Sequence, residues 1–270
     1  MSDQKEQKIA VLTHLDITDK SLIISGIKLA SMFKKELCLV YNYSAKEKTK
    51  HLEFKTALEN YLKPVKKEIP KLKTSVLVLS KKTAVLSETL ADDYEVIIIV
   101  AKAKDFKLHS KSITESPVPF LFVNSDAPVS NFNHVVLPVD IRGQISDSSI
   151  WTSYFGRFNN AEIVAIAASE KGKDEQRRVA KNVMLTKKLF QEFNINLKVY
   201  KGQKSSWRNA FEALEYAKSS GCNLFVILGS SAITPLDYLI GLPERKLIKM
   251  ADVLPVLYIN PRRDNYVLCD

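Results

Sequence analysis

Cys222-Asn-Leu-Phe-Val-Ile-Leu-Gly229 is the stretch that decides the fold, because it predicts a buried strand that ends at a glycine. After a loop, Pro243-Glu-Arg-Lys-Leu-Ile-Lys-Met-Ala251 has the pattern of a short helix. Leu254-Pro-Val-Leu-Tyr-Ile259 then has the composition of a final strand. A strand, a glycine loop, a helix and a strand in this order are typical of the phosphate-binding half of nucleotide-binding α/β domains.

The rest of the second half alternates strands and helices in the same way. Strands are predicted over residues 135–139, 163–167, 197–200, 224–228 and 256–259. The long helix after the second strand has an apolar stripe that consists of Val179, Val183, Phe190 and Phe193. Strands that are apolar along their length and alternate with helices indicate a mostly parallel sheet covered on both faces.

The first half repeats this order without the glycines. Strands are predicted over residues 9–12, 37–41, 76–79, 96–100 and 120–123. One helix has an apolar stripe made of Phe54, Leu58, Tyr61, Leu62, Val65 and Ile69. Matching strands of the two halves lie about 126 to 129 positions apart, and about 136 apart at the fifth strand. The first copy is therefore about seven residues shorter, in the loop between its fourth and fifth strands.

These patterns predict an α/β protein with two tandem five-stranded, mostly parallel sheets that have helices on both faces. The domains are expected over residues 1–126 and 133–260, followed by a tail over 261–270. Between the domains, residues 124–132 contain the Pro, Ser and Asn that are typical of linkers.

Composition favours a globular cytoplasmic protein with no membrane segment. The N-terminus is polar, and no apolar run among the 270 residues approaches the ~18 that suggest a membrane helix. Cys38, Cys222 and Cys269 are far apart and odd in number, so neither a disulfide framework nor a zinc site is expected.

The formal net charge of +10 raises the question of nucleic-acid binding. The basic residues are mostly lysines scattered among acids, and the first arginine of the chain is Arg142. The first half therefore lacks the side chain best suited to bidentate phosphate or guanine contacts. Nucleic acid is an unlikely partner, and a basic surface that holds RNA or another polyanion remains a minor alternative.

Three stretches resemble the universal stress protein family, in its tandem form with two family domains on one chain. His134-Val-Val-Leu-Pro-Val-Asp140 is similar to the opening strand of the family, and Gly202 with the helix over 207–219 is similar to its third strand and helix. Residues 222–259 are similar to its closing signature. The resemblance implies that the two domains pair through their last strands, 120–123 and 256–259, and it allows a homodimer of two such chains.

The resemblance also implies where a nucleotide would bind. In nucleotide-binding members, the opening aspartate holds the adenosine, and a loop of pattern Gly, two residues, Gly, nine residues, Gly, Ser or Thr cradles the phosphates. Glycines allow such a loop to bring successive N–H groups against phosphate oxygens. The matching positions, with two serines that could add donors, are Asp140, Ala168 beside the adenine, Gly229, Ser230, Ser231 and Gly241.

The sequence departs from this pattern in both copies. Ala232 stands at the place of the second glycine, Leu242 at that of the hydroxyl residue, and Pro235 removes an N–H donor. Losing several charge-assisted hydrogen bonds would lower the affinity from micromolar to millimolar. In the first copy, His14 replaces the aspartate and the loop over 101–110 has no glycine, so no family-type site is expected there.

The sequence therefore predicts a universal-stress-type binding or interaction module of the cytoplasmic stress response that is not an enzyme and needs no cofactor. Its partner is an unknown protein, which the apolar residues of the loop over 233–240 would suit. The alternative is an adenine-nucleotide sensor whose second domain binds ATP, with slow hydrolysis. No nucleophile elbow, Walker-type or His-Glu-x-x-His motif is present.

Each candidate residue also has a structural interpretation. Asp140 could equally be a turn or cap residue, and for Gly229 and Gly241 routine chain reversal is favoured over a phosphate loop. His14 and His109 could form a site if they came together, although no metal-ligand spacing supports one. Trp151 and Trp207 are expected to be core or interface anchors.

Overall fold

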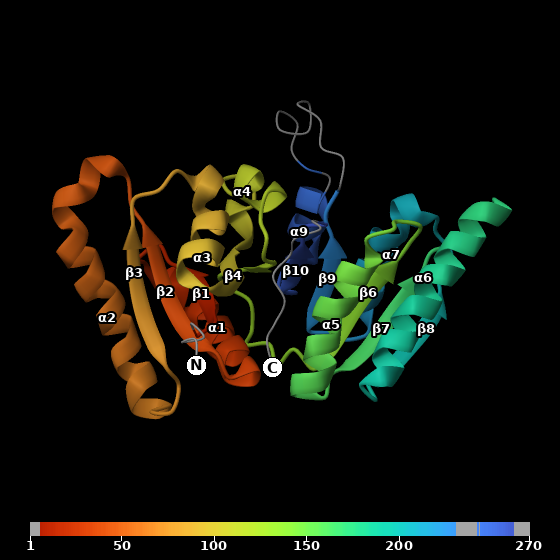
Figure 1. Cartoon of the computed structure of the whole chain (residues 1–270), viewed down its shortest axis with the longest axis horizontal. Helices are drawn as coiled ribbons and strands as arrows, with labels where there is room; N and C mark the ends of the chain where they lie inside the picture. The colour runs from red at the N-terminus through yellow and green to blue at the C-terminus, as the bar shows by residue number, and fades with distance from the viewer. Residues whose placement is uncertain (1–5, 231–241, 243, 262–270) are drawn as a thin grey trace, which may run out of the picture. The chain divides into compact units, whose positions relative to one another are not determined.

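The computed structural model describes residues 6–230, 242 and 244–261. The chain divides into two compact units between Val129 and Ser130, within the stretch where the sequence predicts a linker. Each unit consists of parallel strands with helices packed on them (Figure 1). The predicted α/β class with parallel strands is therefore confirmed.

The first unit has its five strands in the order β3-β2-β1-β4-β5, and every neighbouring pair is parallel. The strands are β1 (Lys8–Leu12), β2 (Glu36–Asn42), β3 (Thr74–Leu79), β4 (Val96–Lys102) and β5 (Phe120–Val123). The α-helices are α1 (Lys20–Phe33), α2 (His51–Glu68), α3 (Leu86–Tyr94) and α4 (Ser110–Thr114). Short 3₁₀ turns are η1 (Ile17–Asp19), η2 (Ala45–Lys50), η3 (Thr83–Val85) and η4 (Ala103–Asp105).

The second unit has the matching order β10-β9-β6-β7-β8, again parallel throughout. Its strands are β6 (His134–Val139), β7 (Glu162–Ala167), β8 (Leu197–Lys201), β9 (Leu224–Leu228) and β10 (Val256–Ile259). Its described helices are α5 (Ile145–Asn159), α6 (Lys173–Glu192), α7 (Ser206–Ser219) and α9 (Glu244–Ala251). All ten strands that the sequence predicts are present in the structure, with ends shifted by at most two residues.

The helices of each unit cover both faces of its strands, because right-handed crossovers to strands on either side of the first strand pass over opposite faces. In the second unit α5 packs against α6, and α7 packs against α9. In the first unit α3 packs against α4, while α1 and α2 contact the strands. Figure 1 shows α2 along the outer strand β3, and α6 along the outer strand β8. The central strands β1, β4, β6 and β9 are consequently buried almost completely.

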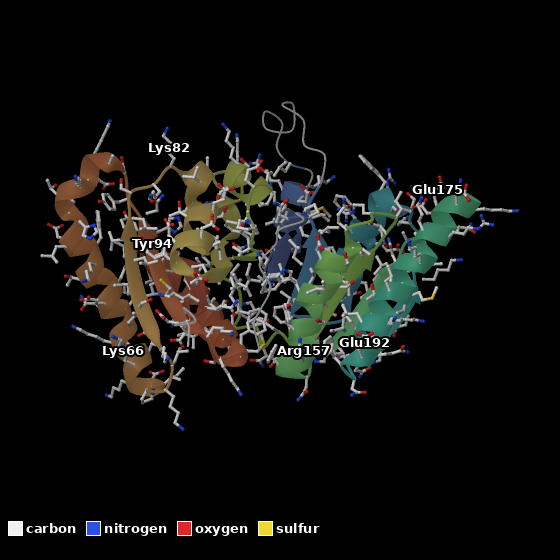
Figure 2. All side chains as sticks on the ribbon, viewed as in Figure 1. Lys66, Lys82, Tyr94, Arg157, Glu175 and Glu192 are labelled. Carbon is white, nitrogen blue, oxygen red and sulfur yellow. The ribbon has the colours of Figure 1, made fainter. Side chains whose placement is uncertain are left out.

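The predicted helical stripes pack inward with one exception. In α2 the buried residues Leu58 and Leu62 belong to the stripe, and in α6 Val179 and Phe190 do. Phe193 lies just beyond the end of α6 and is 40% exposed, with the guanidinium of Arg157 4.2 Å from its ring centroid. A cation over the ring stabilises it without burial. Figure 2 labels Arg157 and Glu192 at the ends of α5 and α6.

The two tryptophans have different environments. Trp151 is buried in the core, as the sequence predicts, whereas Trp207 at the start of α7 is 88% exposed. The core interpretation of Trp207 is therefore wrong, and its role as an interface anchor stays a prediction.

Cys38 and Cys222 are free thiols; burial raises the pKa of Cys38 to about 11, and Cys269 lies outside the described residues. Within the described part of the chain, no helix is long and apolar enough to span a membrane.

Candidate functional site

The strand order brings three predicted site residues to one edge of the second unit. β6 lies between β9 and β7, and the helix that leads to β7 (α5) and the helix that leads to β9 (α7) cover opposite faces, so a crevice is expected at the carboxyl ends of these strands. Asp140 follows β6, Gly229 follows β9 and Ala168 follows β7. The side chain of Asp140 is buried. Ser231 and Gly241 lie outside the described residues.

The carboxylate of Asp140 is already occupied by Arg142, two residues further along the chain. Nε of Arg142 donates to Oδ2 and Oδ1 of Asp140 at 2.9 and 3.1 Å, and Nη2 lies 2.7 Å from Oδ2. The backbone N–H of Arg142 also donates to Oδ1, at 2.9 Å. Both carboxylate oxygens therefore have charged partners within the chain, in the bidentate geometry that makes arginine–carboxylate pairs strong.

The same guanidinium connects the ends of two strands. Nη1 of Arg142 donates to the carbonyl of Leu228 at 2.9 Å and to that of Gly229 at 3.2 Å. These carbonyls end β9, while Asp140 ends β6, so the arginine fills the position between them. Its side chain is 28% exposed. The carboxylate to which the resemblance assigns the adenosine, and the strand end beside it, are therefore already bound by a side chain of the unit itself.

A buried amide and a hydroxyl hold the Asp140–Arg142 turn in place. Nδ2 of Asn182, in α6, donates to the carbonyls of Asp140 and Arg142 at 2.7 and 2.9 Å. From α7, the hydroxyl of Ser206 accepts the N–H of Ile141 at 3.2 Å. Because the turn is fixed from two helices on opposite faces, Arg142 is pre-positioned in the crevice.

Gly229 has a packing role. A Cβ atom at this position would overlap the ring and hydroxyl of Tyr258, which is buried in β10. The N–H of Gly229 donates to the carbonyl of Ile259 at 2.8 Å, so the glycine continues the β9–β10 pairing. The close approach of a neighbouring strand therefore explains this glycine without a phosphate.

Ser230, the remaining described candidate, points to a carboxylate. Its hydroxyl donates to Oε1 of Glu244 at 2.6 Å, and Glu244 is the buried first residue of α9. A carboxylate at a helix N-terminus is favoured by the helix dipole. It also takes the place where an anion would bind and repels one. In the described residues, Oε2 of Glu244 has no hydrogen-bond partner.

In the first unit the equivalent crevice contains a lysine. Lys102 ends β4, and its ammonium group is fully buried 3.1 Å from Oδ1 of Asp19. It also donates to both carboxylate oxygens of Asp16, at 3.2 and 3.3 Å, and to the hydroxyl of Thr18 at 2.5 Å. A hydrogen bond from Thr18 and those from Lys102 lower the pKa of Asp16 to about 2. The loop after β1 is thus tied to the end of β4.

His14 adds a second connection between these loops. Nε2 of His14 lies 2.9 Å from Oδ2 of Asp105, and its backbone N–H donates to both carboxylate oxygens of Asp19 at 2.9 and 3.0 Å. Hydrogen bonds to Asp105 and then to Asp19 raise the pKa of His14 to about 9, so the imidazole is charged at neutral pH. Burial outweighs the attraction of Asp105 and lowers the pKa of His109 to about 4.

The structure therefore brings His14 and His109 near Asp105, one charged and one neutral. The described part of the chain has no group of three or more His, Cys, Asp or Glu residues that could hold a metal ion. The arrangement can pin two loops together.

Comparison with known proteins identifies the fold. No protein-family model matches the sequence, and no curated protein matches it. Among solved structures, the chain is similar to a universal stress protein from Archaeoglobus fulgidus DSM 4304, with a TM-score of 0.69 and 13% identity over 95% of this chain and 97% of that one. The chain has the universal stress protein fold.

A second similar structure is that of the functionally unknown protein PA1789 from Pseudomonas aeruginosa PAO1. Its TM-score is 0.61 at 15% identity, over 96% of this chain and 94% of that one. Identities this low establish the universal stress protein fold and no more. The function must be inferred from the side chains at the strand ends.

Sequence reasoning missed the roles of Arg142 after β6, Lys102 at the end of β4 and Glu244 at the start of α9. A signal existed for Arg142, because the first arginine of the chain stands two residues after the aspartate that ends the opening strand. A signal also existed for Lys102, which directly follows an apolar run that continues to Ala101. Neither signal says which acid the cation contacts.

Proposed function

We propose that the protein is a tandem universal stress protein that acts as a binding or interaction module and does not turn over a substrate. The observation that carries this proposal is the guanidinium of Arg142, which binds Asp140 and the end of β9 at the position of a family-type adenosine. Lys102 supports it, since it fills the corresponding position of the first unit. A domain whose Asp140 and strand end are bound by its own side chains is suited to act through its surface.

Energetics support the same conclusion. A nucleotide in the second unit would have to displace Arg142 from a buried carboxylate and two carbonyls, each a charge-assisted contact of about 1.5–3 kcal/mol. It would also have to place its phosphates near the carboxylate of Glu244, which already engages Ser230. Together these costs exceed ~4 kcal/mol, enough to turn micromolar affinity into millimolar.

An ATP sensor is the competing function. It requires that Arg142 swing away from Asp140 when nucleotide arrives, and that Ser230 and Ser231 supply phosphate donors. Slow hydrolysis would belong to this alternative. It predicts a nucleotide-dependent gain in stability that Asp140→Ala abolishes.

The biological setting is part of the proposal. We place the module in the cytoplasmic stress response, with an unknown protein as partner and with the two domains paired through their last strands. A homodimer of two such chains is compatible with this arrangement. Light scattering on purified protein distinguishes a monomer of 30.5 kDa from a dimer of twice that mass.

Calorimetric titration with ATP and magnesium at low salt tests the proposed function. We expect no binding heat up to about 1 mM nucleotide, and no phosphate release over hours. Asp140→Ala, which removes the carboxylate that an adenosine would need, should change neither result. Micromolar binding at one site per chain that disappears in Asp140→Ala would establish the sensor instead.

A further inference from the structure

The second unit has a groove that borders the Asp140 crevice at Ala168 and extends away from it. It lies between α6 and the ends of β7 and β8, and it has a volume of about 570 Å³. This volume falls in the range of small-molecule sites, roughly 300–1,000 Å³. In Figure 2, Glu175 and Glu192 mark the two ends of the helix that forms one wall.

The floor of the groove is aliphatic. Ala168 and Val179 are buried beneath it, and Val183 and Val199 pack against them while remaining partly exposed. Met184, on the helix side, is 66% exposed, and its flexible thioether can follow the shape of a ligand. None of the described residues that line the groove is aromatic or belongs to a glycine loop. Such a floor suits an apolar aliphatic body better than a stacked base.

The rim of the groove carries unbalanced positive charge. Lys187 from α6 and Lys201 from β8 both line it, and within the described residues neither ammonium group has an ion-pair or hydrogen-bond partner. Among the described residues that line the groove, Glu170 is the one acid, and its Oε1 accepts the N–H of Ser206 at 2.6 Å. Two ammonium groups and one carboxylate leave one positive charge, which a single anionic group would neutralise.

We propose that this groove binds an amphipathic monocarboxylate, with its aliphatic body on the valine floor and its carboxylate between Lys187 and Lys201. The floor supplies affinity through buried apolar area, and the lysines fix the orientation. The groove shares Ala168 with the predicted nucleotide site, but the proposed contacts of Lys187 and Lys201 do not involve Asp140 or Arg142.

Calorimetric titration of the full chain with decanoate, below its micelle concentration, tests the proposal. We expect one site per chain, at least about tenfold weaker binding of the neutral analogue decan-1-ol, and no binding of decyltrimethylammonium. Lys187→Glu and Lys201→Glu should each weaken decanoate binding by at least about tenfold. Lys188→Glu is the matched control, because Lys188 is an exposed neighbour on α6 that does not line the groove.

Three results would overturn the proposal. The first is the absence of saturable decanoate binding by a folded wild-type chain. The second is equal binding of decanoate and decan-1-ol, or equal loss in Lys188→Glu and Lys201→Glu, either of which would show non-specific adsorption. The third is preferential binding of adenosine monophosphate in the same groove, seen as displacement of decanoate. Unchanged thermal unfolding of the lysine variants ensures that each result reports on binding.

Discussion

The first unit fills its crevice with a lysine from the fourth strand and acids from the loop after the first strand, Lys102 with Asp16 and Asp19. The second unit takes both members of its ion pair, Asp140 and Arg142, from the loop after the first strand. The fold thus places a cation of the chain itself at the same point in both copies, from different sequence positions. A position-by-position comparison of the repeats does not show this equivalence.

The side chain of Lys102 is more deeply buried than that of Arg142, so we expect its removal to cost more stability. Lys102→Met would leave the buried carboxylate of Asp19 without its ammonium partner and with His14 as its remaining cation, and we expect a loss of about 3 kcal/mol in the free energy of unfolding. Denaturant unfolding measures it. Lys107→Met, at an exposed lysine of the next loop, should cost less than ~0.5 kcal/mol. Equal stability of the two variants would contradict a structural role for Lys102.

Arg142→Ala should have a smaller effect, because the guanidinium is partly exposed. It leaves Asp140 buried without its charged partner, so we expect a loss of about 1.5–3 kcal/mol. Arg177→Ala removes an exposed pair with Asp174 and should cost less than ~1 kcal/mol. If Arg142→Ala were as mild as Arg177→Ala, the crevice of the second unit would not depend on its arginine.

The residue after the fourth strand sharpens the comparison further, because it is Ala103 in the first unit and Gly229 in the second. Gly229→Ala would make the second unit resemble the first, but the new methyl group would overlap Tyr258. We expect a loss of about 1–3 kcal/mol from this overpacking. Thermal unfolding should show no such loss for Gly143→Ala, where a Cβ atom meets nothing within 4 Å.

The histidine pair gives the first unit a pH dependence of its own. His14 has its pKa raised to about 9, so its stabilisation is complete below its unfolded pKa of about 6.5 and is lost as pH rises through 9. His109 has its pKa lowered to about 4, so its contribution is complete above 6.5 and is lost as pH falls toward 4. Stability should therefore be greatest near pH 6.5.

Partial exposure of His14 limits its effect to about 1–2 kcal/mol after allowance for solvent screening. Melting temperatures recorded across pH 4 to 10 measure both limbs of the curve. His14→Ala should flatten the alkaline limb, and His109→Leu the acid limb. An alkaline limb that is unchanged in His14→Ala would show that the contact with Asp105 does not hold the proton.

Much of the fold was predictable because each strand has its own apolar run. The stretches over 96–100 and 224–228 are buried strands in any context, and the helices between them have regular stripes. The position of Asp140 was also predictable, since the carboxyl ends of parallel strands meet at one edge. The exposure of Trp207 was not predictable, because a place in the first turn of a helix does not say which face of that helix the side chain occupies.

The filling of the crevices was not predictable, because it depends on contacts between distant residues. Lys102 contacts acids more than eighty positions away, and Arg142 contacts carbonyls at a similar separation. Sequence alone gives the types of these residues and the strand ends they occupy, but the partner of a charged side chain follows from the packed structure. The same holds for Ser230, which was predicted as a phosphate donor and instead donates to Glu244.

A crystal structure of the protein grown with ATP and magnesium tests the filled crevices most directly. We predict no nucleotide beside β6, with the Arg142 guanidinium within hydrogen-bond distance of Asp140 and of the carbonyls of Leu228 and Gly229, and Lys102 buried among its acids. An adenosine bound to Asp140, with Arg142 turned out to solvent, would contradict this account and establish a nucleotide sensor.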